Sequence, residues 1–288
     1  MAYLLAIGSA ILYGAADFTG GLTTRRAGTI PVVIVSQFSG LLLLALMLPV
    51  LPHSSPSGPD FFWGVVAGLT GGIGVALLYR ALAIGIMAVV APTTAVCAVT
   101  IPVVVSVLLG ERPVPLAVMG IVLGIVSIVL VSQQHAAQHP GVSPSGSAGR
   151  RSSGVGIALA SGVAIGFFFL ALARTGPQAG MWPLLASRSA SVTLFGAIAI
   201  AGRRSIRMPA RAVTLAVACG IVDMLANALY LLAARQGPLS LVVTLSSLYP
   251  ASTVLLARVV LGERLNNWQV TGVVCAMAAV ALIVSGGQ

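Results

Sequence analysis

The chain has 288 residues, of which 58% are hydrophobic and only 7% are charged. Soluble globular proteins carry about 25% charged residues, so this composition indicates an integral membrane protein and excludes a large soluble domain. All fifteen basic residues are Arg, which excludes a Walker-type ATPase and a pyridoxal enzyme, because both need a Lys. The net charge of +10 is spread over several loops and does not indicate nucleic-acid binding.

Membrane-spanning helices are predicted along most of the chain, because apolar segments of about 20 residues alternate with short polar turns. The first half predicts helices at 3–22, 30–51, 61–82, 86–109 and 115–132. A stretch rich in Gly, Ser and Pro at 133–153 predicts a flexible linker. The second half predicts helices at 154–174, 181–201, 211–234, 238–260 and 267–285. The expected fold is an all-α polytopic membrane protein with ten transmembrane helices in two units, 1–132 and 154–288.

A four-residue motif closes one apolar segment in each unit. Leu-Gly-Glu-Arg occurs at 109–112 and again at 261–264, 152 residues later. An internal repeat of this kind indicates two copies of one structural unit. Five helices per copy is an odd number, so the second copy enters the membrane in the opposite sense, giving the inverted repeat found in many secondary transporters.

Two carboxylates inside predicted spans, Asp17 and Asp223, are the strongest functional candidates, because burying a charge in a bilayer costs about 2.5–3.5 kcal/mol on insertion scales. Asn227 and Tyr230 follow Asp223 at i+4 and i+7, so these three side chains share one helix face. Asp17 shares a face with Tyr13. Proton coupling and recognition of a substrate ammonium are the functional interpretations, and a structural polar contact is the alternative.

Further polar side chains within the spans are candidates for substrate contacts. Arg188 could pair with a carboxylate, bind a substrate carboxyl group or extend to the membrane interface, and Gln37 occupies the equivalent region of the first copy. Hydroxyl groups near helix-interrupting Pro residues could line a cavity or bond between helices; these are Thr94, Ser246 and Ser247. Pro250 removes one helical hydrogen bond from the ninth predicted span.

Other conspicuous residues are interpreted as structural. Gly110 and Gly262 are expected to end helices, with Glu111 and Glu263 near the N-terminus of the helix that follows. The three Cys residues lie apart inside apolar segments and are expected to be small buried side chains. His135 and His139 are four residues apart, but Pro140 follows, which favours a loose tether over a metal site. Neither a metal nor a cofactor is predicted.

The segment from Tyr230 to Ile283 resembles the EamA repeat of the drug/metabolite transporter superfamily. The resemblance rests on residues that recur in the two copies in the order Ala, Gly, Gly-Glu-Arg, Gly: Ala81, Gly85, Gly110, Glu111, Arg112 and Gly120, then Ala233, Gly237, Gly262, Glu263, Arg264 and Gly272. The second copy also carries the family's Pro at Pro250, whereas the first has Ala98 there and Pro102 one turn later. The resemblance implies a transporter with both termini in the cytoplasm. The distribution of Arg residues instead favours both termini outside.

The predicted function is secondary transport, with export as the favoured direction, of a small metabolite such as an amino acid by alternating access between the inverted repeats. Protons are a candidate coupling ion, the lipid bilayer and a small-molecule substrate are the expected partners, and the protein is a monomer or homodimer in the plasma or inner cell membrane. An intramembrane aspartyl protease using Asp17 and Asp223 is one alternative. A lipid or sugar-carrier flippase of the same superfamily is another.

Overall fold

The computed structural model describes residues 1–51, 53–110, 115–133, 148–236, 242, 245–263 and 265–286, and this part of the chain contains helices and no strands. The helices of the first half are α1 (Ala2–Ala27), α2 (Thr29–Met47), α3 (Gly58–Ile84), α4 (Met87–Leu108) and α5 (Pro115–Gln133). Those of the second half are α6 (Ala148–Leu172), α7 (Trp182–Ala201), α8 (Ala210–Gln236), α10 (Tyr249–Leu261) and α11 (Asn267–Gly286). Two 3-10 turns, η1 (Leu48–Val50) and η2 (Pro177–Ala179), precede α3 and α7.

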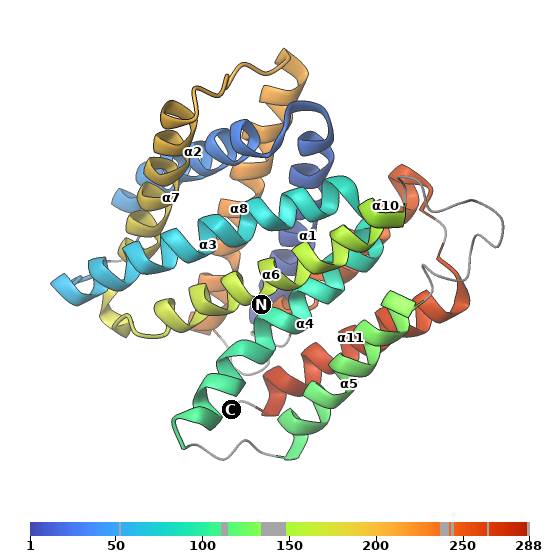
Figure 1. The fold of residues 1–288 in the computed structure, drawn as a ribbon. Helices are drawn as coiled ribbons and strands as arrows, with labels where there is room; N and C mark the ends of the chain where they lie inside the picture. The colour runs from blue at the N-terminus through green and yellow to red at the C-terminus, as the bar shows by residue number, and fades with distance from the viewer. Residues whose placement is uncertain are drawn as a thin grey trace.

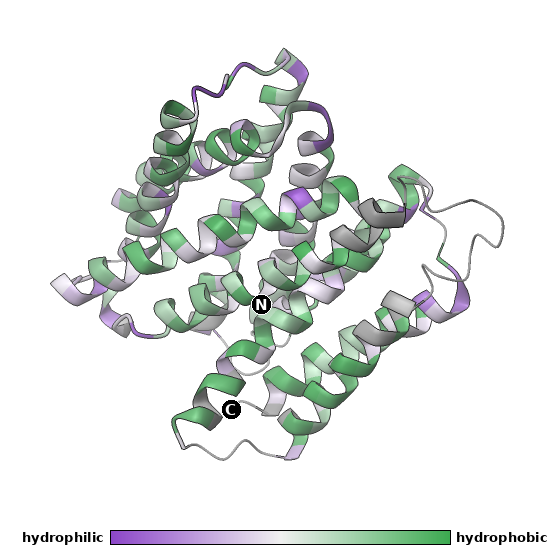
Figure 2. Cartoon of the chain, viewed as in Figure 1, coloured by the Kyte–Doolittle hydropathy of each residue, from purple (hydrophilic) through white to green (hydrophobic). Residues whose placement is uncertain are grey.

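The helices have the length and composition of membrane spans. Within the described residues, seven are long and apolar enough to cross a bilayer, and three shorter apolar helices accompany them at Met87–Pro102, Val118–Ser127 and Tyr249–Leu261. Apolar residues dominate along nearly all of the ribbon in Figure 2. Large apolar side chains such as Leu46, Phe62 and Val259 are exposed, as expected where the surrounding solvent is lipid. The chain is therefore a multi-pass membrane protein.

The ninth predicted span, 238–260, differs from the expectation. Leu245 and Ser246 are helical, Ser247 and Leu248 form a turn, and α10 begins only at Tyr249. Pro250 lies in the first turn of α10, where its missing N–H costs nothing, whereas inside a continuous helix its ring would clash with the preceding turn. The start of α10 thus places Pro250 where a helix tolerates it best, although α4 continues through Pro92 and Pro102.

Eight of the helices pack into two four-helix bundles, each of which mixes the two halves of the chain. We name them the α3 bundle (α3, α4, α6 and α7) and the α1 bundle (α1, α2, α8 and α10). Interhelical hydrogen bonds follow the same division. In the α3 bundle, Ser161 of α6 and Ser191 of α7 donate to carbonyls of α3, and in the α1 bundle, Ser9 of α1 and Ser39 of α2 donate to carbonyls of α8.

The packing obeys the pseudo-twofold symmetry expected of an inverted repeat. The pairs α3–α6, α3–α7 and α4–α6 of the first bundle have their counterparts in α8–α1, α8–α2 and α10–α1 of the second. The pairs α2–α7, α4–α10 and α5–α11 each join a helix to its own repeat counterpart and therefore lie about the axis. Figure 1 shows α5 and α11 side by side, and both also contact α4.

Glycines bring α3 and α7 into close contact. A Cβ added at Gly64 would lie 2.7 Å from the Pro183 carbonyl oxygen, and one added at Gly68 would lie 2.2 Å from the Ser187 carbonyl oxygen. A Cβ added at Gly72 would lie 2.7 Å from the Ser191 hydroxyl oxygen. The three glycines of α3 and the three residues of α7 each recur every four positions, so one face of α3 meets one face of α7 along two turns. Small residues are the usual means of close helix packing in membranes. This packing fixes the position of Arg188, the residue after Ser187.

Candidate functional site

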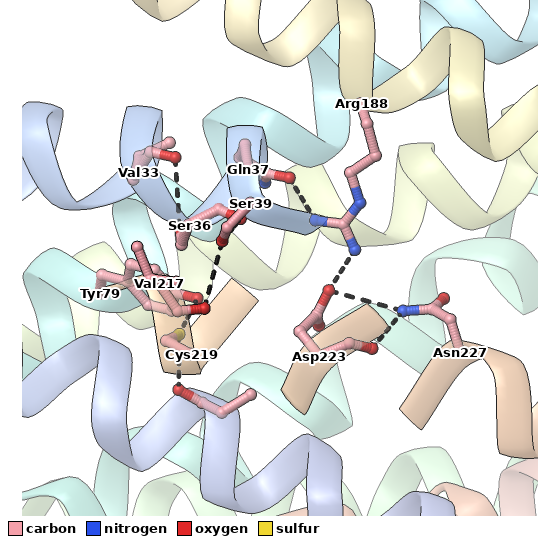
Figure 3. A network of polar contacts seen from close by, with 11 residues as sticks. Val33, Ser36, Gln37, Ser39, Tyr79, Arg188, Val217, Cys219, Asp223 and Asn227 are labelled. Carbon is pink, nitrogen blue, oxygen red and sulfur yellow. Dashed lines mark hydrogen bonds and ion pairs between the residues drawn. The ribbon is translucent and has the colours of Figure 1, made fainter. Parts of the chain in front are cut away.

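A charged network joins the two bundles (Figure 3), with Gln37 and Asp223 near the middle of α2 and α8 and Arg188 in the second turn of α7. Arg188 of α7, in the α3 bundle, donates from Nη2 to Asp223 Oδ2 on α8 and from Nη1 to Gln37 Oε1 on α2, both in the α1 bundle. Asn227, one turn along α8, donates from Nδ2 to the Asp223 carbonyl oxygen at 2.8 Å and lies 3.5 Å from Asp223 Oδ2. Arg188 therefore points into the protein and does not extend to the membrane interface.

The network borders space that a sphere the size of a water molecule can reach. The side chains of Arg188 and Asp223 keep 15% and 23% of their surface exposed, whereas Gln37 is 4% exposed. An ion pair wholly removed from water would recover little of its desolvation cost, and partial exposure reduces that cost. Three side chains from three helices thus present an accessible guanidinium and an accessible carboxylate at the interface between the bundles.

Asp17 of α1 adds a second carboxylate to this region. It is half-buried, and in the part of the chain that the structure describes its carboxylate has no hydrogen-bond or salt-bridge partner. It lies within electrostatic reach of Asp223 and of Tyr13 and Tyr249. The rings of Tyr13 and Tyr249 meet edge to face with centroids 6.3 Å apart. The region therefore holds two carboxyl groups and one guanidinium.

Tyr230 belongs to the same region. It lies two turns beyond Asp223 on α8, is half-buried, and is within electrostatic reach of Tyr13. The structure therefore brings together seven of the residues singled out in the sequence, from four helices: Tyr13, Asp17, Gln37, Arg188, Asp223, Asn227 and Tyr230.

Tyr79 and Cys219 form a second polar contact across the bundles, which the sequence does not reveal. The Tyr79 hydroxyl of α3 lies 3.1 Å from Cys219 Sγ of α8, which also contacts the Ala16 carbonyl oxygen of α1 at 3.2 Å. Both side chains are buried, at 4% and 1% exposure. A Tyr in an apolar helix carries no pattern that indicates its partner, so no signal in the sequence identifies this pair.

The remaining candidate hydroxyls serve as contacts between helices. Thr94 Oγ1 donates to the Ala158 carbonyl oxygen at 3.2 Å, and Ser246 Oγ donates to the Ala6 carbonyl oxygen at 3.4 Å. Both are buried, as the interhelical alternative expects. Ser247 is half-buried in the turn before α10. The bonds of Thr94 and Ser246 do not reach the Arg188 network.

The glycines of the repeated motif end helices as expected, but Glu263 has a different role from the one predicted. Gly110 and Gly262 have positive φ angles of 92° and 65°, which glycine adopts without strain. Glu263 accepts hydrogen bonds from the backbone N–H groups of Met87 and Ala88, at the start of α4. It does not cap α11, the helix that follows, where Gln269 instead accepts from the Asn266 backbone N–H at 3.0 Å. Glu111, His135 and His139 lie outside the described residues.

No group of His, Cys, Asp and Glu within the described ranges is arranged to hold a metal ion. A pocket of about 160 Å³ lies between the end of α2 and the start of α7, and its lining includes Leu48, His53, Met181 and Trp182. It does not include the charged network.

Comparisons with known proteins agree with this architecture. The family model of the EamA-like transporter family matches residues 1–133 and 152–285, one match for each half of the chain. No curated protein matches the chain. Nineteen chains of solved structures are similar. One of them, a crystal structure described only as that of a protein, superposes with a TM-score of 0.60 at 18% identity, covering 98% of this chain and 95% of that one. This likeness shows the fold alone.

Members of the matched family are transporters and not enzymes, so the intramembrane protease alternative does not apply. The structure gives an independent physical objection, because a protease dyad needs two carboxylates that share a proton, whereas Asp223 is paired with Arg188. The two family matches, the two-repeat fold and the membrane-spanning helices together show that the chain is a membrane transporter that belongs to the EamA-like transporter family.

Proposed function

We propose that the protein is a secondary transporter, working as an exporter in the plasma or inner cell membrane, for a small zwitterionic metabolite such as an amino acid. The proposal rests mainly on the network of Arg188, Asp223 and Gln37, because this network joins the two bundles within the membrane-spanning part of their helices. A substrate bound there touches both bundles. Its binding energy can therefore favour one arrangement of the bundles over another, which alternating access requires.

Arg188 supplies the group that recognises a carboxylate. Its guanidinium presents several donors in a planar fork, and two of them are held by Asp223 and Gln37. A substrate carboxylate that replaces Gln37, a neutral partner, gains a charge-assisted hydrogen bond. Asp223 can keep its contact with Arg188 while the substrate binds, so the charge of Arg188 stays neutralised when the substrate enters or leaves.

Asp17 supplies the group that recognises an ammonium. Its carboxylate has no partner among the described residues and lies within electrostatic reach of Tyr13 and Tyr249, whose rings pack together. Aromatic rings attract cations, and an unpaired carboxylate in a low-dielectric region does so more strongly. A zwitterion spanning Arg188 and Asp17 satisfies both charges.

Proton coupling has a physical basis in the same residues. Protonation of Asp223 removes the negative charge that holds Arg188 and frees the guanidinium for a substrate anion. Protonation of Asp17 removes the carboxylate charge that recognises a substrate ammonium, so a proton and the substrate can compete for Asp17. The two events have opposite effects on substrate binding, because protonation of Asp223 favours a substrate carboxylate.

Reconstituted transport tests the proposal. Purified protein in liposomes is screened with radiolabelled amino acids and organic cations, with and without a pH gradient, and Asp17→Asn is compared with Ser189→Ala on exposed α7 surface. We expect flux of at least one zwitterion, loss of that flux in Asp17→Asn and retention in Ser189→Ala. Flux of no amino acid would contradict the substrate class, and undiminished flux in Asp17→Asn would contradict the site. The protein acts as a monomer or homodimer in this proposal.

A further inference from the structure

The two bundles are also joined at one end of the molecule, by residues outside the proposed substrate site. We name this the α3–α4 end; there α1, α3 and α10 end, and α2, α4 and α8 begin. Glu263, just after α10 in the α1 bundle, accepts from the backbone N–H of Met87 with Oε1 at 3.1 Å and from that of Ala88 with Oε2 at 3.0 Å. Both N–H groups belong to α4 of the α3 bundle.

Arg25, at the end of α1, makes the complementary contact. Its Nη2 donates to the carbonyl oxygens of Leu82 at 3.2 Å and Gly85 at 3.4 Å, at the end of α3, and lies 3.7 Å from Glu263 Oε1. A carboxylate of the α1 bundle thus meets the positive N-terminus of α4, and a cation of the same bundle meets the negative C-terminus of α3. Each charge is stabilised by a helix end of the other bundle.

The apolar packing below these contacts closes the same end. The main apolar cluster includes Phe18, Val33, Leu82, Met87 and Ala257, which come from both bundles and from the half of each helix nearest the α3–α4 end. The Tyr79–Cys219 contact lies in this cluster. The charged network, with 15% and 23% exposure at Arg188 and Asp223, lies beyond it.

We propose that Arg25 and Glu263 form a gate that holds the α3–α4 end closed and must open once in every transport cycle. The proposal rests on alternating access as proposed above, and it names the two residues that control it. When the bundles part at this end, both carboxylate contacts to α4 and both guanidinium contacts to α3 are lost together, because all four join one bundle to the other. Neutralising either side chain therefore favours the conformation open at the α3–α4 end.

The inverted repeat makes the gate specific to one end. At the offset of 152 residues, the position equivalent to Arg25 is Pro177, which has no charge. Among the described residues, the helix end that corresponds to that of Arg25 therefore has no cation at the equivalent position. The Arg25 contacts are in this respect particular to the α3–α4 end.

Cys219 provides a reporter already present in the chain. It is 1% exposed, lies in the apolar cluster below the gate and becomes accessible if the bundles part there. In a Cys97→Ala/Cys275→Ala background, the rate of its reaction with a membrane-impermeant methanethiosulfonate is measured in nanodiscs. We expect Arg25→Gln and Glu263→Gln to raise the rate roughly tenfold, because each removes charge-assisted hydrogen bonds.

The matched control is Arg26→Gln. Arg26 is adjacent, carries the same charge, and in the described structure makes no hydrogen bond or ion pair. Its variant should react at the parent rate, and Glu263→Asp should restore part of the slow reaction. Equal rates in Arg25→Gln, Glu263→Gln and Arg26→Gln would overturn the gate.

A second reporter separates gating from loss of stability. Tyr230→Cys, in a background with all three native Cys replaced by Ala, places a single thiol two turns beyond Asp223 toward the opposite end. Opening of the gate should make Cys219 react faster and the thiol introduced at position 230 react more slowly, because one end closes as the other opens. Faster reaction of both thiols would show local unfolding and overturn the gate. Neither measurement needs a substrate, so failure of the proposed substrate class leaves this test intact.

Discussion

The contact between α3 and α7 provides a test of how packing positions Arg188. A Cβ at Gly68 would lie 2.2 Å from the Ser187 carbonyl oxygen, which is 1.2 Å short of the 3.4 Å at which ordinary contact begins. The obstacle is backbone, so no side-chain rotation relieves it. In Gly68→Ala, α7 must therefore move away from α3 by about 1 Å at the residue next to Arg188, or tilt.

Two effects of Gly68→Ala oppose each other in stability. Overpacking costs about 1–3 kcal/mol, and replacing a helical Gly by Ala gains about 0.5–1 kcal/mol. We therefore expect a net loss of stability of up to about 2.5 kcal/mol. Transport should fall more steeply, by roughly tenfold to a hundredfold, because a displacement near 1 Å at a binding group has effects of that size.

Gly196→Ala is the matched control, because Gly196 lies on α7 and a Cβ there meets nothing within 4 Å. Thermal unfolding in detergent and uptake in proteoliposomes are measured for both variants. Gly196→Ala should keep the parent uptake and gain slightly in stability. If Gly68→Ala matched it in both assays, the view that the glycine contact positions Arg188 would be refuted.

Three further predictions follow from the polar contacts. Arg188→Ala and Asp223→Ala should each lower the stability by about 3 kcal/mol, because each leaves the partner's charge unpaired. The double variant should recover most of this loss. Additive losses in thermal unfolding would contradict the pairing. Asp223→Asn should lose uptake driven by a pH gradient but keep substrate exchange, and driven uptake at the parent rate would exclude a coupling role. Ser161→Ala removes a buried 2.8 Å hydrogen bond to the Gly74 carbonyl oxygen within the α3 bundle. It should lower the stability by about 0.6 kcal/mol and leave transport unchanged. A transport defect in a stable variant would contradict a purely structural role.

The sequence predicts the helices and the charged residues of the site because both follow from the cost of placing polar groups in a bilayer. That cost identified Asp17, Asp223 and Arg188 individually, and helical spacing added Asn227 and Tyr13. The duplicated motif predicted the inverted repeat, which the family matches and the paired packing of helices support.

The partners of these residues could not be predicted, because they depend on which helices pack together. Nothing in the sequence shows that the bundles mix the two halves of the chain, so the contact between Tyr79 and Cys219 was missed. Glu263 was expected to stabilise the helix that follows it, since helix dipoles act locally, but the fold brings α4 closer. The turn before Pro250 was missed because hydropathy continues through it.

Substrate binding by Arg188 variants shows whether the Arg188–Asp223 pair forms the substrate site. Once a transported zwitterion is identified, its binding to purified parent protein, Arg188→Lys, Arg188→Gln/Asp223→Asn and Gly196→Ala is measured by isothermal titration calorimetry. The double variant removes both charges of the pair and so keeps the fold intact. We expect loss of binding in the double variant, weakened binding in Arg188→Lys and parent affinity in Gly196→Ala. Parent affinity in a folded Arg188→Gln/Asp223→Asn protein would place the substrate site elsewhere.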